Sequence, residues 1–201
     1  MNYIVIDQGT SSTKAFLFDA NGKIIHSNRA KYSLNRPKPF HIECDPQIIL
    51  NDINRLFYEM RALSKRNSVR GVGIAFQRST FLFWEKLTCK PLTPAISWQD
   101  TRAAKTLKNF NRHKQKLWNI TGTPLSAKFG GPKFFHMVKH NRTLNDKIKN
   151  NEVYFGPLSS FITHAITGSP AVDESIAGRT LLYNGKEGKW SRFATDLFNV
   201  P

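Results

Sequence analysis

The sequence is poor in cysteine and contains no long apolar run. Its two cysteines, Cys44 and Cys89, lie far apart and form no Cys-x-x-Cys pair, which argues against a disulfide framework or a structural zinc site. No apolar segment approaches the length of a transmembrane helix, and Met1 leads directly into an expected strand instead of a signal peptide. We therefore expect a cytoplasmic protein with reduced thiols and no contact with membranes.

Several common ligand-binding motifs are also missing. The chain has neither a Gly-x-x-x-x-Gly-Lys-Ser/Thr segment nor a Gly-x-Gly-x-x-Gly segment, so the two commoner phosphate-binding loops are absent. His136 and His140 are four residues apart, but no neighbouring carboxylate or cysteine completes a set of metal ligands. Both histidines are therefore predicted to lie on the surface.

Acidic residues are scarce, because 30 Lys and Arg accompany only 14 Asp and Glu, giving a formal net charge of +16. The excess is concentrated between Lys105 and Lys149, where eleven basic residues accompany one acid, Asp146. A basic face attracts nucleic acid, anionic membranes or phosphorylated metabolites. No nucleic-acid-binding motif accompanies this one, so we interpret it as a solvated helical surface and expect no nucleic-acid partner.

The residues that are present have the composition of a globular protein, with 40% hydrophobic and 12% aromatic residues. Asp45 followed by Pro46 is typical of a helix start, and apolar residues then recur every three or four positions to about Lys65. The other expected helices begin at Asp100 or Thr101, run from Gly156 to Gly168, and cover residues 191–198. The expected strands cover residues 3–7, 13–19, 23–30, 69–77, 80–84 and 95–98.

The order of these elements predicts an α/β fold. Three strands, a helix and a further strand are typical of a mixed sheet with helices on its faces. Residues 121–150 are the least regular stretch, because they are rich in glycine, proline and lysine. We expect this stretch to be an inserted region of loops and helix over the site.

The most informative segment is the turn between the first two expected strands. Its glycine lets the backbone approach a ligand, and its three hydroxyl groups lie beside backbone N–H groups. This composition is typical of a phosphate-binding nest, and Asp7 at the end of the first strand would hold a hydrated Mg²⁺. The predicted phosphate-binding residues are Gly9, Thr10, Ser11, Ser12 and Lys14. The alternatives are an ordinary hairpin with a polar turn, and a Lys14 side chain that points to solvent.

Short segments along the whole chain resemble, in the same order, motifs of the FGGY family of carbohydrate kinases, the sugar and polyol kinases related to glycerol kinase. These segments are Asp7–Lys14, His41–Pro46, Gln77–Thr80, Ser97–Arg102, Thr121–Pro124, Gly131–Lys133, Asp173–Ala177 and Arg179–Asn184. The resemblance implies a ribonuclease H-like domain of the actin-like ATPase superfamily. It also implies that the full-length enzyme transfers the γ-phosphate of ATP to a carbohydrate hydroxyl, with Mg²⁺ as cofactor.

By the same resemblance, residues 1–201 are the N-terminal, sugar-binding domain and end before its usual finish. The family's catalytic base is an Asp of a Gly-Asp-Gln segment, which is expected downstream of Pro201, as is the ATP-binding domain. None of the 201 residues is therefore assigned as catalytic. The chain alone is expected to be inactive and to hold neither ATP nor Mg²⁺ tightly, and a homo-oligomer is possible.

Four residues match the family's polyol-contacting positions. Arg78 and Trp98 match an arginine and a tryptophan of glycerol kinase, but Ser79 stands where that enzyme has a glutamate. Lys128 stands where it has a tyrosine. Loss of a carboxylate and gain of an ammonium group favour a sugar that is larger or more acidic than glycerol. Alternatively, Trp98 is a core residue and Lys128 a solvated loop residue.

Two other classes of function remain open. A non-catalytic sugar- or partner-binding module of the same fold needs no catalytic base. A metal-dependent nuclease of the ribonuclease H type would use the basic charge, but it needs several converging carboxylates. The strand that ends at Gln77 delivers Gln-Arg in place of an acid, which argues against the nuclease. Glu43 is expected to be the partner of an arginine.

Overall fold

The computed structural model describes residues 1–64 and 69–201, which form two compact units. Unit 1 comprises Met1–Leu34 and Asp45–Gln77, and unit 2 comprises Asn35–Cys44 and Arg78–Pro201. The end of the long helix expected at Lys65 lies outside the described residues. None of the helices that the structure describes has the length and apolar character needed to cross a bilayer.

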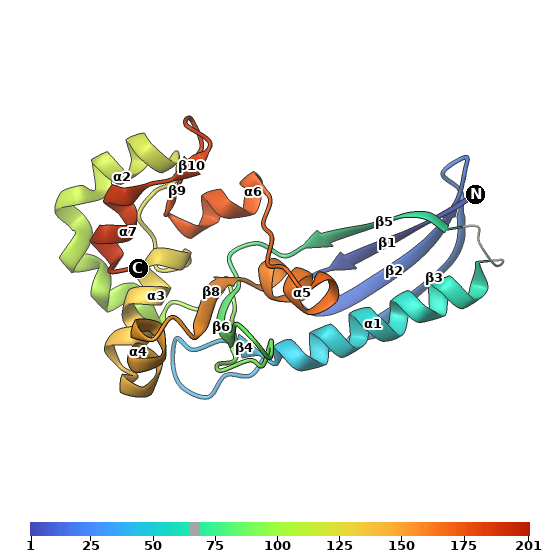
Figure 1. Cartoon of the computed structure of the whole chain (residues 1–201), viewed down its shortest axis with the longest axis horizontal. Coiled ribbons are helices and arrows are strands. Elements are labelled where there is room, and N and C mark those ends of the chain that lie inside the picture. Colours follow the sequence, from blue (N-terminus) through green and yellow to red (C-terminus); the bar gives the residue numbers. More distant parts are fainter. Residues whose placement is uncertain (65–68) are drawn as a thin grey trace. The chain divides into compact units, whose positions relative to one another are not determined.

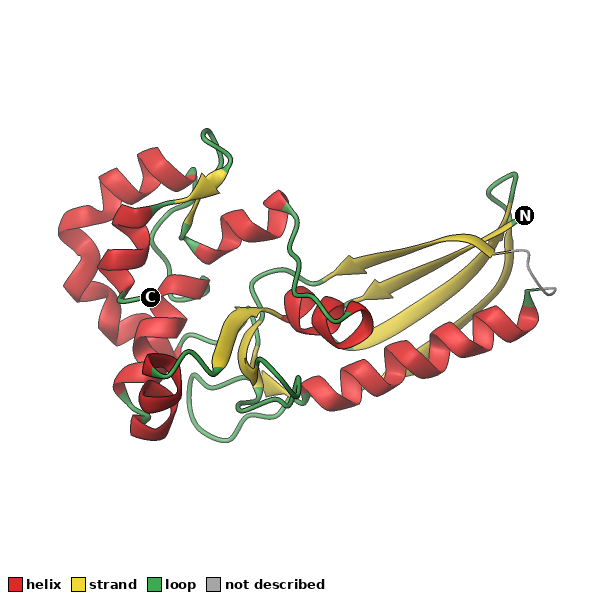
Figure 2. Cartoon of the chain, in the orientation of Figure 1, coloured by secondary structure: helices red, strands yellow, loops and turns green. Residues whose placement is uncertain are grey.

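Unit 1 is built on a four-stranded mixed sheet (Figure 2). Its strands, in sheet order, are β3 (Ile24–Lys31), β2 (Ser12–Asp19), β1 (Asn2–Gln8) and β5 (Val69–Phe76). The β1–β2 and β2–β3 pairs are antiparallel, whereas β1 and β5 are parallel. The mixed sheet predicted from the element order is therefore confirmed.

One long helix, α1 (Pro46–Leu63), packs on β1, β2 and β3 (Figure 1). The Asp45 side chain accepts hydrogen bonds from the N–H groups of Gln47 and Ile48, so the predicted cap is confirmed. The apolar stripe of the helix is buried, and each fully buried Leu or Ile stabilises the fold by roughly 1.5–3 kcal/mol. The stripe consists of Ile49, Ile53, Leu56 and Met60. Burial of this stripe holds α1 against the sheet whose β1 and β2 strands carry the turn at Gly9.

Unit 2 contains a second sheet, which is antiparallel. Its strands, in sheet order, are β4 (Glu43–Cys44), β7 (Ala95–Ile96), β6 (Phe81–Glu85) and β8 (Val153–Pro157). The helix α5 (Leu158–Thr167) follows β8 and ends at Gly168, whose φ of +77° is the left-handed conformation that favours glycine. The prediction that Gly156 opens this helix is wrong, because Gly156 pairs with Leu82 in the sheet.

The rest of unit 2 is mainly helical. The further elements are η1 (Arg102–His113), α2 (Lys114–Thr121), α3 (Gly130–Lys139), α4 (Arg142–Lys149), α6 (Glu174–Ala177), η2 (Gly178–Thr180), β9 (Tyr183–Asn184), β10 (Lys189–Trp190) and α7 (Arg192–Phe198). The helix expected from Asp100 or Thr101 is instead a 3₁₀ segment, η1, followed by α2. The helix α7 confirms the one predicted over 191–198.

Residues 121–150 are more regular than the sequence suggests, because α3 and α4 occupy most of them. Pro132 and two glycines lie in the first turn of α3, where backbone N–H groups have no partner inside the helix, so they do not break it. Asn141 caps α4 by accepting a hydrogen bond from the Leu144 N–H at 3.0 Å. The position of these residues matters more than the composition of the stretch.

The expected basic surface is confirmed as solvated, with one exception. Nine of the eleven lysines and arginines between residues 105 and 149 are exposed, and Lys147 is half-buried beside Glu85. Lys133 is completely buried. Composition alone cannot single out this lysine, because its partners come from distant segments.

We expect Gly131→Ala to destabilise the protein by about 1–3 kcal/mol, as is typical of overpacked cores. A Cβ atom at Gly131 would lie 2.4 Å from the ring of Phe198, which is itself fully buried. Gly178→Ala is the matched control, because its Cβ would have no atom within 4 Å and its φ is −57°. The measurement is the free energy of unfolding in urea. Equal values for the two variants would contradict the close approach of α3 and α7.

Candidate functional site

The predicted phosphate-binding turn forms the tip of the β1–β2 hairpin in unit 1. The Gly9 N–H donates to the Ser12 carbonyl at 3.0 Å and closes the turn. A Cβ atom at Gly9 would lie 3.3 Å from the same oxygen, so a larger residue would push the turn open. The hairpin is confirmed, whereas its use as a phosphate cradle stays a prediction.

A network of hydrogen-bonded polar side chains contacts the backbone of this turn. The Tyr32 hydroxyl donates to the Gly9 carbonyl and accepts from Gln8 Nε2 at 3.0 Å and Gln77 Nε2 at 3.1 Å. Gln8 Nε2 also donates to Gly9 O at 2.8 Å, and the Tyr32 N–H donates to Ser11 O at 3.2 Å. The carbonyl groups of Gly9 and Ser11 are therefore hydrogen-bonded within the protein. Sequence analysis missed Tyr32, because its partners are 23 and 45 residues away.

Asp7 and Lys14 are opposite each other in the β1–β2 register. Their Oδ2 and Nζ atoms are 3.5 Å apart, and both side chains are about half exposed. The described residues contain no group of three metal-ligating side chains, so Asp7 belongs to no preformed metal cage among them. Mg²⁺ is commonly held by one or two carboxylates together with substrate phosphates. Asp7 therefore fits a Mg²⁺ that arrives with a nucleotide.

In unit 2, Trp98 lies in a tight turn next to Lys128. The Asp100 N–H donates to the Ser97 carbonyl at 3.0 Å, and this bond closes the turn around Trp98. Trp98 is 37% exposed, so its interpretation as a core residue is wrong. Lys128 Nζ lies 5.7 Å from the ring centroid of Trp98, within the range of a cation–π contact. The structure thus brings two predicted substrate-binding residues together.

A buried ionic network fixes the far end of this turn. Asp100 is fully buried and accepts from Arg102 Nη2 at 2.8 Å and from the Ile42 N–H at 2.6 Å. Arg102 Nη2 also donates to Glu43 Oε1 at 2.6 Å, which confirms Glu43 as the partner of an arginine. Burial acts to lower the pKa of Arg102, but the hydrogen bonds to both carboxylates outweigh it and raise that pKa above its usual value. The guanidinium group therefore stays charged.

The other two predicted substrate-binding residues are placed differently from each other. Arg78 is exposed, and among the described residues its side chain has no ion pair or hydrogen-bond partner. Ser79 is only 7% exposed, and its φ of +63° is unusual for a residue other than glycine. The strained turn therefore presents the arginine to solvent while the serine faces the interior.

The histidine pair on α3 is closer to the interior than predicted. His136 and His140 have ring centroids 4.7 Å apart. The surface prediction is confirmed for His140 and wrong for His136, which is half-buried because α3 turns its inner side toward the core. Burial first, and then the neighbouring His140, lower the pKa of His136 to about 4.

We expect His136 to reduce stability as the pH falls from about 6.5 to about 4. The unfolded chain binds a proton at His136 in this window and the folded chain does not, so the free energy of unfolding rises with pH there. Urea unfolding at a series of pH values should give a smaller loss in His136→Phe than in the parent chain. His140→Gln removes only the smaller of the two influences on the pKa of His136, so it should reduce the loss less than His136→Phe does. An unchanged pH profile in His136→Phe would contradict the expected protonation.

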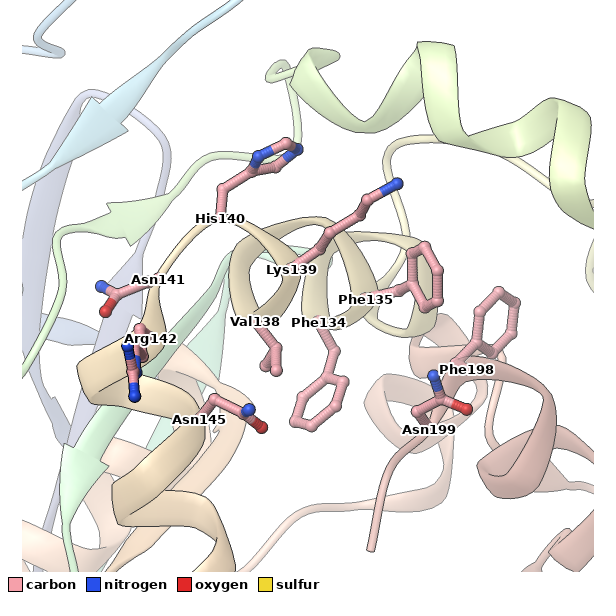
Figure 3. Close-up of a pocket in the computed structure, with 10 residues that line it drawn as sticks. All are labelled: Phe134, Phe135, Val138, Lys139, His140, Asn141, Arg142, Asn145, Phe198 and Asn199. Atoms are coloured by element: carbon pink, nitrogen blue, oxygen red, sulfur yellow. The ribbon is translucent and has the colours of Figure 1, made fainter.

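A separate pocket of about 620 Å³ lies in unit 2 and is lined by residues of α3 and α4 and by Phe198 and Asn199 (Figure 3). Phe134 and Phe198, which are both buried, belong to its lining, and Lys139, His140 and Arg142 are exposed around it. None of the predicted phosphate- or substrate-binding residues lines it. The pocket is therefore distinct from the Trp98 turn.

Comparison with known proteins identifies the class to which this chain belongs. The FGGY family of carbohydrate kinases, N-terminal domain, matches residues 2–201, so the chain belongs to this family. The fold is accordingly the ribonuclease H-like fold of the actin-like ATPase superfamily, as the resemblance implied.

Among its relatives, the chain is 34% identical to glycerol kinase of Borreliella afzelii over 208 residues, covering 100% of this chain and 42% of that protein. It is 31% identical to glycerol kinase of Nocardia farcinica, covering 98% of this chain and 40% of that protein. The chain therefore spans about two fifths of the length of these curated relatives.

Two solved structures show the same fold. Plasmodium falciparum glycerol kinase with ADP is 29% identical with a TM-score of 0.92, and the match covers 99% of this chain and 41% of that one. Xylulose kinase from Rhodospirillum rubrum has a TM-score of 0.90 at 17% identity, covering 100% of this chain and 41% of that one. The second likeness shows the fold alone.

Proposed function

We propose that this chain is the N-terminal, sugar-binding domain of an ATP-dependent carbohydrate kinase, which phosphorylates a hydroxyl group of a sugar or polyol. Membership of the FGGY family and the similarity to glycerol kinases support the proposal. The observation that carries it at the site is the exposed indole of Trp98 with Lys128 over its ring, in a turn fixed by a buried ionic network. An aromatic face beside a polar donor suits a polyol.

The remaining predicted residues have complementary roles in this proposal. Arg78 donates hydrogen bonds to polyol oxygens, for which a planar guanidinium group is well suited. The turn Gly9–Ser12 and Lys14 bind phosphate oxygens of ATP, and Asp7 holds the accompanying Mg²⁺. Phosphoryl transfer depends almost entirely on positioning and on charge stabilisation, so these groups must act together with an ATP-binding domain.

The substrate that we propose is larger or more acidic than glycerol. The positions 78, 79, 98 and 128 carry two cations and no carboxylate. Each charge-assisted hydrogen bond from such a cation contributes roughly 1.5–3 kcal/mol, which favours an anionic group over a neutral hydroxyl. Glycerol offers only hydroxyl groups, so its affinity should be lower than that of an anionic polyol.

The test is calorimetric titration of the 201-residue chain with glycerol and with gluconate, an anionic polyol. We expect gluconate to bind more tightly, and Lys128→Met to weaken gluconate binding about tenfold while changing glycerol binding less. Lys105→Met is the control, because Lys105 is an exposed lysine on η1. If glycerol alone binds, and Lys128→Met leaves that binding unchanged, the proposed substrate class is wrong.

The catalytic base and the ATP-binding domain lie outside these 201 residues in our proposal. The chain alone should therefore release no ADP above background in a coupled assay with a panel of polyols and ketoses. Turnover that is lost in Asp7→Ala would instead place the base within the chain. A chain that binds polyols, within a full-length protein that transfers no phosphate, would favour the non-catalytic sugar-binding module.

Partners and location follow from the same proposal. The domain meets ATP through the ATP-binding domain, acts in the cytoplasm and has no nucleic-acid partner. A homo-oligomer remains compatible with it, and light scattering at several concentrations measures this directly.

A further inference from the structure

A buried lysine lies behind the two segments that carry the candidate polyol-binding residues. Lys133 belongs to α3, and its side chain is fully buried. Its Nζ donates to the carbonyl oxygens of Ser97 at 2.7 Å and Ser79 at 2.9 Å, with a longer contact to Ile96 O at 3.5 Å. An ammonium group has three donors and no acceptor, so these three carbonyls match its full capacity.

The two nearer carbonyls lie just beyond the pairing of β6 with β7. Phe81 and Ile96 are the residues paired between these strands. Ser79 precedes β6 and Ser97 follows β7, and they adjoin the candidate arginine and tryptophan respectively. The ammonium group of Lys133 therefore links the backbone of both segments at the place where their functional side chains emerge.

The local packing of α3 allows Lys133 to reach this position. A Cβ atom at Gly130 would lie 3.0 Å from the Phe81 ring and 3.0 Å from Thr180 Cα, so the helix approaches its neighbours closely. Lys133 Nζ also lies 5.5 Å from the centroid of the Phe81 ring. The strained φ of Ser79 is maintained by the contacts around this residue. One of these contacts is the hydrogen bond that the Ser79 carbonyl accepts from Lys133.

A charged group at this place is costly, because the side chain of Lys133 is fully buried. Burial, the largest influence, lowers the pKa of Lys133 to about 7, and the nearby Asp100 only partly opposes this effect. Removal of Lys133 would leave the buried Ser79 carbonyl without this donor, which also costs stability, so the lysine is tied to this place by the contacts that it makes. The hydrogen bonds of Lys133 thus contribute defined geometry.

We propose that Lys133 is a positioning residue of the polyol site, which fixes the segments of Arg78 and Trp98 by joining the carbonyls of Ser79 and Ser97. That the positioned residues bind a polyol rests on the proposed function. That Lys133 fixes the two segments does not depend on the proposed function, and it can be measured without a ligand.

The first test compares Lys133→Met with the parent chain in two measurements. We expect the urea unfolding midpoint to fall, because the carbonyls of Ser79 and Ser97 lose a donor, while the folded variant binds gluconate about tenfold more weakly, which corresponds to about 1.4 kcal/mol. Lys139→Met is the matched control, since Lys139 is an exposed lysine of the same helix, and it should change neither quantity. Parent-like affinity in Lys133→Met would overturn the proposal.

The second test needs no ligand. Acrylamide quenching of tryptophan fluorescence is measured in the parent chain and in Lys133→Met. In each background the same measurement on the Trp98→Phe variant is subtracted, which leaves the contribution of Trp98. We expect stronger quenching in the Lys133→Met background, because the turn around Trp98 is released. Equal quenching would overturn the positioning role even if no polyol binds, whereas failure of all polyols to bind the parent chain contradicts the proposed function alone.

A third measurement decides the question if Lys133→Met does not fold. In the parent chain labelled with ¹⁵N-lysine, the Nζ resonance of Lys133 should shift as gluconate is added and level off with the binding curve. A resonance that stays unchanged when the site is saturated would overturn the proposal.

Discussion

Asp100→Ala is expected to lower the free energy of unfolding by about 3–5 kcal/mol, as is typical when one partner of a buried ion pair is removed. The Arg102 side chain is only 10% exposed, so it would lose a carboxylate without gaining water. The Ile42 N–H, which donates to Asp100 at 2.6 Å, would lose its acceptor as well. Urea unfolding of the variant and the parent chain measures this loss.

The matched control is Asp196→Ala, which removes an exposed carboxylate. Asp196 lies 3.9 Å from Arg192, and their side chains are 71% and 95% exposed. Exposed pairs contribute about 0–1 kcal/mol, so this variant should unfold nearly as the parent does. Similar losses in the two aspartate variants would contradict the structural role of the Asp100 network.

Arg78→Ala is expected to weaken polyol binding by about a hundredfold, or about 2.7 kcal/mol. This magnitude corresponds to the loss of one or two charge-assisted hydrogen bonds of roughly 1.5–3 kcal/mol each. The free energy of unfolding should stay unchanged, because the side chain is exposed and has no ion pair within the described part of the chain. Calorimetry and urea unfolding of the same samples measure the two quantities.

Arg70→Ala is the control for this substitution, since Arg70 is an exposed arginine on β5. It should leave both polyol affinity and stability near the parent values. Unchanged affinity in Arg78→Ala would remove this arginine from the polyol site. A loss of affinity accompanied by an equal loss of stability would indicate a structural effect in place of a binding contact.

The local features of the fold could be predicted from the sequence. The hairpin around Gly9, the cap at Asp45 and the end of α5 at Gly168 each depend on residues within a few positions of one another. Their geometry follows from backbone preferences and side-chain capping, which are properties of short segments. These elements therefore appear where they were expected.

Long-range contacts could not be predicted in the same way. Tyr32 acts on Gly9 from 23 residues away, and Lys133 acts on Ser79 across 54 residues. A single sequence shows neither the direction of these side chains nor the carbonyl groups they reach. The glycines and proline before Lys133 are typical of irregular structure by composition, although the glycines here allow α3 to pack closely.

Part of the candidate site lies between these two cases. The motif around Trp98 could be recognised by resemblance, and the partnership of Glu43 with an arginine was predicted. The stacking of Lys128 near Trp98 and the burial of Ser79 depend on tertiary packing, so only the structure reveals them.

Binding of a polyol against Trp98 is the central claim, and NMR of the ¹⁵N-tryptophan-labelled chain tests it most directly. The chain has four tryptophans, and the indole signal of Trp98 is assigned by its absence in Trp98→Phe. We expect that signal to shift saturably as gluconate is added, with no comparable shift for Trp84, Trp118 or Trp190. An unchanged Trp98 signal, or a shift confined to the other three indoles, would contradict a polyol site at this turn.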